Sequence, residues 1–497
     1  MGHIFEMSTQ ELIRQMKRKE LCPLELVHST INKFEDENPR LNAICEKFYE
    51  QALSIAKSKT ELMTKMAPED YPPLFGIPFS IKEMFSFEGA KRTAGNIHYQ
   101  NDVATQTSTI IRRLIDAGGI PLVTTNVPEL GFWYECYNPI YGQTNNPYDT
   151  HRTPGGSSGG EAALIGAGCH PIGIGSDIGG SIRMPAYFCG LFGHKPTEQT
   201  IPITGHFPYD FERFSKTPPD LYTHTAAGPL TRKAEDLEIM FEIMCGADGI
   251  DPCTENREQV LENKQKYSAK EFQLNQIKIF HLNSPEIHLA SAPDQDVSEK
   301  ISQVAQAFLE LGCNVAEFDR RFFLRSVELW FNEVKRTKSS SFSELLSPEG
   351  NIHYAKEYFQ ILRGKPNYTF SNLTVALLEK LTSEQRQSEL LHHEHEVLKQ
   401  NLMEKLDENS VLILPVHPRV APKHNLSKIT PFDFIYTGIF TTLGFPAVSV
   451  PLGLNSAGLP TGVQIIARPH CDHLCFRLAT VLENLFGGWV RPAQSLA

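Results

Sequence analysis

The chain contains 497 residues, of which 41% are hydrophobic and 21% charged, an ordinary composition for a globular protein with a large core. Its 47 Lys and Arg residues stand against 58 Asp and Glu residues, and the net charge of −11 excludes a protein built mainly to grip nucleic-acid phosphates. No apolar run approaches the roughly 18 residues that a membrane-spanning helix needs, and the N-terminus has no apolar stretch of a signal peptide. These features predict an intracellular protein, cytoplasmic or peripherally membrane-associated, without a transmembrane segment in this chain.

The first 60 residues are predicted to be helical. A capping box over 8–11 begins one helix, and Pro23 opens a second helix that ends at 38–39, where Asn precedes Pro. We therefore expect residues 1–60 to form an N-terminal helical segment that packs on a core domain of residues 61–497.

Strands alternate with helices further along the chain. Residues 75–82 have the pattern of a buried strand, 108–117 that of a helix stopped by two glycines, and 120–123 that of the next strand. The alternation returns over 277–318. It predicts an α/β fold in which helices sandwich a central mixed β-sheet, with a motif core at 74–200 and a helical, variable excursion at about 250–400.

The Gly/Ser-rich segment 153–183 is the most informative part of the sequence. As a dinucleotide-binding loop it lacks the third glycine, because Ile178 stands at that position. As a nucleophile elbow it lacks the preceding hydrophobic strand, because residues 145–154 have a loop composition. A third interpretation is purely structural: two glycine-rich turns where backbones pack closely.

Chemistry at the two ends of this segment favours a catalytic site. Gly179 and Gly180 precede Ser181, so unshielded backbone amides there can form an oxyanion hole. A serine beside such a hole attacks a carbonyl group when a base accepts its proton. Ser157 stands at a helix start, where its hydroxyl is placed to relay that proton. Lys82 ends an apolar run, and burial would lower its pKa enough for a neutral lysine base; an exposed lysine at a strand end is the alternative.

Four segments together resemble the amidase signature family of serine hydrolases: GIPFSIKE at 76–83, GGSSGGE at 155–161, GSDIGGSIRMPA at 175–186 and GLFGHKPT at 190–197. Further segments look like the fatty-acid amide hydrolases, above all the second vertebrate type and its invertebrate relatives. They lie at 126–128, 141–147, 421–424, 436–440, 451–455 and 458–464. The resemblance spans nearly the whole chain and is weakest at 250–400. It implies the amidase signature fold in a single large domain.

The resemblance also implies a Ser–cis-Ser–Lys triad. By the family pattern Ser181 is the nucleophile, Lys82 is the base, and Ser157, which precedes a cis peptide bond, is the proton shuttle. Asp177 and Arg183 flank this site and are interpreted as structural supports.

Further site residues follow from the same resemblance. The backbone amides of Ile178, Gly179, Gly180 and Ser181 would form the oxyanion hole. Gly131 would lie at the substrate amide, and Phe132 near the acyl channel. The mechanism requires no metal and no cofactor.

The predicted enzyme hydrolyses amide bonds, and its expected substrates are fatty-acid amides such as N-acyl ethanolamines and primary fatty amides. An acyl-enzyme would form, and free fatty acid and amine would be released. The alternatives are a short-chain amidase, a subunit of a glutamine-dependent amidotransferase, and a non-catalytic scaffold that keeps the fold. Besides the substrate, the hypotheses for partners are a peripheral membrane contact and a second copy of the chain; nucleic acid is not expected.

Some features carry weaker expectations. Aromatic residues near the motif are candidates to line an acyl cleft, although core packing is the alternative for each: Phe132, Trp133, Tyr134, Phe188 and Phe192. The segment HHEHE at 392–396 lacks zinc-site spacing and is predicted to be a solvated helix face. Three glycosylation sequons begin at Asn367, Asn372 and Asn425, and we interpret them as chance matches because no signal peptide is evident.

Overall fold

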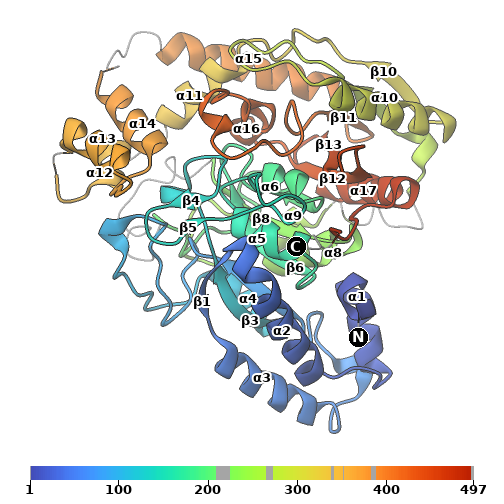
Figure 1. Cartoon of the computed structure of the whole chain (residues 1–497). Coiled ribbons are helices and arrows are strands. Elements are labelled where there is room, and N and C mark those ends of the chain that lie inside the picture. The colour runs from blue at the N-terminus through green and yellow to red at the C-terminus, as the bar shows by residue number, and fades with distance from the viewer. Residues whose placement is uncertain are drawn as a thin grey trace.

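An eleven-stranded mixed β-sheet runs through the part of the chain that the structure, a computed structural model, describes: residues 2–208, 224–262, 264, 272–336, 341–350, 352–381 and 388–493. Helices cover both faces of this sheet (Figure 1). The predicted α/β sandwich in one large domain is confirmed. Strand pairs β2–β3, β2–β6, β9–β10 and β9–β11 are parallel, and the other neighbouring pairs are antiparallel.

Across the sheet the strands are β1 (Ile44–Lys47), β3 (Ile120–Thr125), β2 (Pro78–Lys82), β6 (Ile172–Asp177), β8 (Ala226–Thr231), β7 (Phe192–Lys195), β12 (Ala447–Leu454), β13 (Pro460–Ala467), β11 (Ser410–Leu414), β9 (Lys278–His281) and β10 (Asn314–Glu317). Strands β4 (Tyr137–Asn138) and β5 (Gly142–Gln143) form a separate ribbon.

The described helices are α1 (Thr9–Lys17), α2 (Pro23–Leu41), α3 (Tyr49–Leu62), α4 (Thr109–Asp116), α5 (Gly159–Gly166), α6 (Arg183–Phe188), α8 (Glu235–Met244), α9 (Arg257–Val260), α10 (Gln295–Glu310), α11 (Ser326–Arg336), α12 (Phe342–Leu346), α13 (Tyr354–Leu362), α14 (Phe370–Leu381), α15 (Ser388–Lys405), α16 (Ile435–Thr442) and α17 (Asp472–Phe486). None of them combines the length and the apolar character needed to cross a membrane.

The sheet is apolar on both faces because successive strand residues point to opposite sides. In β11, Val411 and Ile413 belong to the core formed with α1, α4, α8, α10 and α17. Leu412 and Leu414 belong to the opposite core, formed with α11, α15 and α16. All four side chains are buried. The two cores hold the strands rigidly, and this rigidity fixes the loops at the strand ends.

The N-terminal segment differs from the prediction in two ways. Helix α2 continues through Pro39 to Leu41 instead of ending at 38–39. A proline lacks the backbone N–H and so removes one hydrogen bond of the helix. The helix ends at Asn42, which adopts the left-handed conformation and donates its N–H to the Asn38 carbonyl oxygen. The segment also contributes β1, which pairs with β3. It is therefore not helical throughout, and its division from residues 61–497 stays a prediction.

The excursion at about 250–400 contains sheet as well as helix. The strands predicted around 277–280 and 313–318 are present as β9 and β10, with α10 between them. Helices α11 to α15 account for the predicted helical part, and α12, α13 and α14 pack together at one edge of the molecule (Figure 1). Parts of the polar stretch 250–275 lie outside the described residues.

Candidate active site

The candidate site begins at the carboxyl ends of two neighbouring strands. Strands β2 and β6 are parallel, with Ile81 opposite Ile174, so the residues that follow emerge at the same edge of the sheet. Lys82 ends β2, and Asp177 ends β6. The apolar residues earlier in each strand are buried in the core, and they hold these polar ends in place.

Lys82 is fully buried, with 0% of its surface exposed. Its Nζ lies 2.7 Å from Ser157 Oγ, 2.8 Å from Ser176 Oγ and 3.4 Å from the Ser176 carbonyl oxygen. Burial lowers the pKa of Lys82 to about 7, although the negative charge of Asp177 acts in the opposite direction. A large fraction of Lys82 is therefore uncharged near neutral pH.

Ser157 lies in the loop that leads into α5, and a cis peptide bond joins Gly156 to Ser157. The cis bond thus precedes Ser157 rather than following it. Gly131, expected at the substrate amide, lies beside Ser157: it adopts φ +65°, and a Cβ there would lie 3.6 Å from Ser157 Oγ and within 2.7 Å of the Met84 side chain. A larger residue at this position would have to adopt the left-handed conformation and displace the end of the Met84 side chain.

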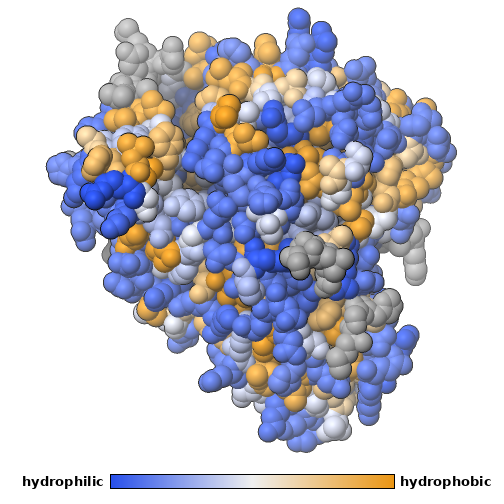
Figure 2. Space-filling view, in the orientation of Figure 1, coloured by the Kyte–Doolittle hydropathy of each residue, from blue (hydrophilic) through white to orange (hydrophobic). Residues whose placement is uncertain are grey.

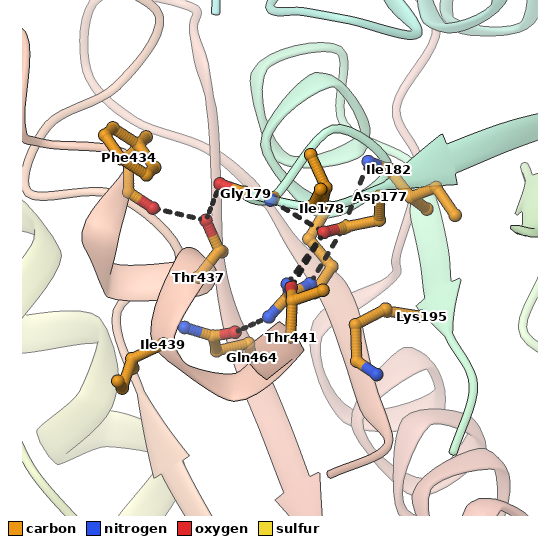
Figure 3. A network of polar contacts seen from close by, with 12 residues as sticks. Asp177, Ile178, Gly179, Ile182, Lys195, Phe434, Thr437, Ile439, Thr441 and Gln464 are labelled. Atoms are coloured by element: carbon orange, nitrogen blue, oxygen red, sulfur yellow. Dashed lines mark hydrogen bonds and ion pairs between the residues drawn. The ribbon is translucent and has the colours of Figure 1, made fainter. Parts of the chain in front are cut away.

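The loop that carries Ser181 is fixed by the buried ion pair of Asp177 and Arg183, 3.0 Å apart (Figure 3). The Asp177 carboxylate also accepts the backbone N–H groups of Gly180 and Ile182, at 2.7 and 3.2 Å. Burial would raise the pKa of Asp177, but the Arg183 charge and these hydrogen bonds lower it below its ordinary value. Both residues therefore support the loop structurally, as the sequence indicated.

Two side chains from distant segments hold the carbonyl groups of the same loop. Trp330 of α11 donates its Nε1–H to the Ile178 carbonyl oxygen at 3.0 Å. Thr437 Oγ1 of α16 lies 3.1 Å from the Gly179 carbonyl oxygen and 2.7 Å from that of Phe434, and the two oxygens share its single hydroxyl proton. Because the C=O and N–H of one peptide unit point in opposite directions, the Trp330 bond also sets the direction of the Gly179 N–H. Gly180 adopts φ +109°, and a side chain there would collide with Thr437.

Three of the four predicted oxyanion amides remain available. The N–H of Gly180 donates to Asp177, as stated above, and cannot serve a substrate in this arrangement. Within the described part of the chain, no acceptor takes the N–H of Ile178, Gly179 or Ser181. Ser158 donates its N–H to the Ser181 carbonyl oxygen at 3.2 Å, which ties the two Gly/Ser loops together.

Two cavities meet at Ser181. The larger has a volume of about 560 Å³, and the smaller about 130 Å³. Both are lined by Gly131, Phe132, Ile178, Ser181, Trp330 and Val334. Aromatic and aliphatic side chains dominate the rest of the larger cavity: Trp133, Tyr134, Met184, Phe331, Phe370, Val375, Leu378, Phe432 and Phe434. The smaller cavity also reaches Ser157, Ser176, His206 and His224.

Two of the aromatic residues proposed for the cleft are not in it. Phe188 and Phe192 have no exposed surface and pack in the protein core, whereas Phe132, Trp133 and Tyr134 line the larger cavity. The difference arises from direction: α6 and β7 turn the first two rings inward, away from the loop that carries Ser181.

The histidine-rich segment 392–396 is not a fully solvated face. In α15 the His395 ring is buried, and its Nε2 lies 3.1 Å from Thr442 Oγ1. His392 approaches Glu333 at 3.1 Å. The prediction of a solvated face was wrong here because α15 packs against α11 and α16. One sequon is also inaccessible: Asn372 is 1% exposed and donates to the Glu129 carbonyl oxygen at 2.7 Å.

Several residues of the site were not predicted from the sequence. Ser176 was part of a recognised motif, but its role depends on contact with Lys82. Thr437 stands in the recognised segment 436–440, but its role depends on contact with Gly179. Trp330 and His206 come from segments that carry no local motif.

The chain is similar to known proteins over nearly its whole length. The family model "Amidase" matches residues 25–476, and the chain belongs to this family of amidase signature enzymes. It is 35% identical to human "Fatty-acid amide hydrolase 2" over 98% of this chain and 90% of that protein. It is 34% identical to "Fatty-acid amide hydrolase 2-A" of Danio rerio, with the same coverage of both chains. Among solved structures, 6-aminohexanoate cyclic dimer hydrolase superposes with a TM-score of 0.80, 21% identity and coverage of 98% of this chain and 99% of that one.

These findings confirm the resemblance inferred from the sequence and the amidase signature fold. The protein is an enzyme that hydrolyses amide bonds. The residues responsible and the substrate it prefers are matters of inference from the site.

Replacing Asp177 with Asn should destabilise the protein strongly. The side chain keeps its shape, but Arg183 is left buried without a counter-charge, a loss of about 3–5 kcal/mol. Glu394→Gln is the control, because it breaks an exposed ion pair with Arg325, which contributes about 1 kcal/mol or less. Denaturant unfolding measures both. Equal losses for the two variants would contradict a supporting role for the buried pair.

Proposed function

We propose that this enzyme is a serine hydrolase that cleaves long-chain fatty-acid amides to free fatty acid and amine. The observation that carries the proposal is the large, mainly apolar cavity that opens onto Ser181. The names of the human and Danio rerio relatives agree with this substrate class. N-acyl ethanolamines, which are endocannabinoid-like lipids, and primary fatty amides are the substrates to test, and they would place the enzyme in lipid metabolism.

In the proposed mechanism Lys82, Ser157 and Ser181 act as a proton-transfer triad. Neutral Lys82 accepts the proton of Ser157 across their 2.7 Å hydrogen bond, and Ser157 in turn accepts the proton of Ser181. Ser181 Oγ then attacks the amide carbon. Because burial holds the pKa of Lys82 near neutrality, the base is available without a histidine.

The oxyanion that forms on attack is stabilised by backbone amides. We assign this role to the N–H groups of Ile178, Gly179 and Ser181, which have no acceptor among the described residues. Such preorganised donors contribute several kcal/mol to transition-state stabilisation. The leaving amine takes the proton back through Ser157, and water then hydrolyses the acyl-enzyme along the same proton path. These reaction steps use only side chains, backbone amides and water.

The acyl chain is assigned to the larger cavity and the head group to the smaller one. A volume of about 560 Å³ falls in the range of pockets that enclose a ligand of this size, and each buried methylene contributes about 0.8 kcal/mol. Phe132 lines both cavities, in agreement with its expected place near the acyl channel. Of the charged residues that line the larger cavity, Lys335 and Lys428 are exposed and Glu379 is half-buried. The rest of the lining is mainly apolar, which suits an acyl chain better than the charged groups of glutamine. This favours a lipid substrate over the amidotransferase alternative.

We also propose a peripheral membrane contact through α13 and α14. Leu362, Phe359, Leu378 and Phe370 are 85%, 57%, 53% and 45% exposed. Figure 2 shows apolar side chains gathered over this part of the molecule. Phe370 and Leu378 line the larger cavity as well, so a lipid substrate would enter the cavity beside the bilayer. A homodimer stays a prediction.

The substrate assignment predicts release of free fatty acid from oleamide and N-acyl ethanolamines, with short amides such as propionamide hydrolysed far more slowly. Ser181→Ala should abolish both activities and labelling by a fluorophosphonate probe. Mass spectrometry of the released acid, over a series of acyl lengths, measures the preference. Preference for short amides, or ammonia release from glutamine, would instead support one of the alternative functions.

The base assignment predicts that kcat/KM rises with pH through about 7 and then stays level. The protonated lysine cannot accept a proton, so activity is lost as the pH falls below the pKa of Lys82, which is about 7. Lys82→Met should lower kcat by about 10²–10⁴-fold.

Lys195 is the matched control for the base, since it is also fully buried, with a pKa lowered by burial to about 8. Lys195→Met should keep the pH profile of the wild type. A profile that changes with Lys195 and not with Lys82 would refute the assignment of the base.

The membrane contact predicts that the protein co-sediments with phosphatidylcholine vesicles. Neutral lipid is chosen because the net charge of −11 opposes anionic surfaces. The double variant Phe359→Asp, Leu362→Asp should lose this binding. Leu289→Asp, a change at an apolar residue that is 58% exposed on another segment, should keep it. Equal binding by all three proteins would argue against α13 as the contact.

A further inference from the structure

A chain of hydrogen bonds that ends at a histidine lies behind Lys82. His206 Nε2 lies 2.8 Å from Ser176 Oγ, which lies 2.8 Å from Lys82 Nζ. The exposed fraction of all three side chains is 4% or less. The polar groups therefore run in series from His206 through Ser176 and Lys82 to Ser157, with little of their surface exposed.

The His206 ring is uncharged at neutral pH. Burial, and then the positive charge of Lys82, hold the pKa of His206 well below its ordinary value. The ring packs edge-on against Phe85, with 4.7 Å between centroids. A neutral imidazole carries one proton, so its Nε2 is either a donor or an acceptor toward Ser176.

The direction of this hydrogen bond decides what Lys82 can do. A neutral lysine has two N–H donors and one lone pair. If His206 Nε2 accepts the Ser176 proton, the Ser176 oxygens accept both Lys82 donors, and the lone pair remains free for Ser157. If Nε2 donates instead, the Ser176 proton is free to point to the Lys82 lone pair, where it competes with the proton of Ser157.

We propose that His206 is a positioning residue that, through Ser176, directs the lone pair of Lys82 toward Ser157. The inference rests on the proposed function, because it assumes that Lys82 is the base. His206 neither gains nor loses a proton in the cycle: the proton from Ser157 moves to Lys82 and returns. His206 accepts the hydrogen bond of the Ser176 hydroxyl, so that the Ser176 proton does not compete with the Ser157 proton for the lone pair of Lys82.

The test compares two substitutions of the histidine. His206→Phe keeps a ring beside Phe85 but has no acceptor, and it should lower kcat about 10–100-fold while KM changes by less than about twofold. His206→Gln supplies an amide oxygen as acceptor and should recover kcat to within about threefold of the wild type. Because His206 also lines the smaller cavity, the labelling rate of Ser181 by a small fluorophosphonate is measured too, and it should follow kcat.

His170→Phe is the matched control for burial. His170 is also buried and neutral, with a pKa lowered to about 3, and it packs edge-on against Phe34. It does not line either cavity. This variant should keep the kcat of the wild type, and thermal unfolding of each variant reports any loss of stability.

A double-mutant cycle tests whether His206 acts through Ser176. In a Ser176→Ala background there is no hydroxyl proton to direct, so adding His206→Phe should not lower kcat further. Additive losses would overturn the proposal, as would wild-type kcat in His206→Phe, or failure of His206→Gln to recover activity while still folded.

These outcomes are separable from failure of the proposed function. A wild-type enzyme without amidase activity, or full activity in Lys82→Met, would refute the proposed mechanism itself. An active wild type and an inactive Lys82→Met, together with an unaffected His206→Phe, would refute only the role given to His206.

Discussion

The buried ion pair between Asp177 and Arg183 is the interaction on which the site depends. Asp177 ends β6, and Arg183 begins α6, so the pair closes the loop that carries Ser181. Arg183 also donates to Thr441 of α16 and Gln464 of β13. One salt bridge therefore joins the motif core to the C-terminal part of the sheet. Such a buried pair is tolerated because the carboxylate oxygens of Asp177 and the guanidinium nitrogens of Arg183 all have hydrogen-bond partners.

Arg183 and Lys82 are both buried in the site, but their surroundings differ. Arg183 lies 3.0 Å from a carboxylate, and arginine side chains are always charged in proteins. Among the described residues, Lys82 has only hydroxyl and carbonyl groups as hydrogen-bonding partners. None of these groups carries a charge to compensate the loss of hydration, and burial lowers the pKa of Lys82. A carboxylate thus contacts Arg183, which stays charged, whereas the hydrogen-bonding partners of Lys82, which has to be neutral to act as a base, are uncharged.

The sequence predicted the parts of the site that local motifs carry. Lys82, Ser157 and Ser181 stand in segments with unusual Gly/Ser spacing or at the end of a buried strand. Ser157 and Ser181 both line the smaller cavity, and Lys82 lies behind Ser157, with Nζ 2.7 Å from its Oγ. The contacts of Trp330 and Thr437 were not predictable, although Thr437 stands in the recognised segment 436–440, because each side chain reaches the Ser181 loop from a helix that is distant in sequence. Phe188 and Phe192 show the converse: they stand close to the motif in sequence, yet strand and helix direction turns them into the core. The helix through Pro39 shows the same limit for the fold: it extends beyond the proline to Leu41, which is fully buried, a tertiary contact that the sequence does not reveal.

Trp330 links the cavity to the chemistry. Its ring lines both cavities, and its Nε1–H holds the Ile178 carbonyl oxygen at 3.0 Å. The peptide unit held in this way is the one whose N–H belongs to Gly179, one of the three amides assigned to the oxyanion. Because the indole is 3% exposed and packs edge-on against Phe434, it cannot rotate without disturbing the cavity wall. A substrate that fills the larger cavity therefore packs against the same side chain that aims an oxyanion donor, so acyl-chain binding and transition-state stabilisation share one structural element.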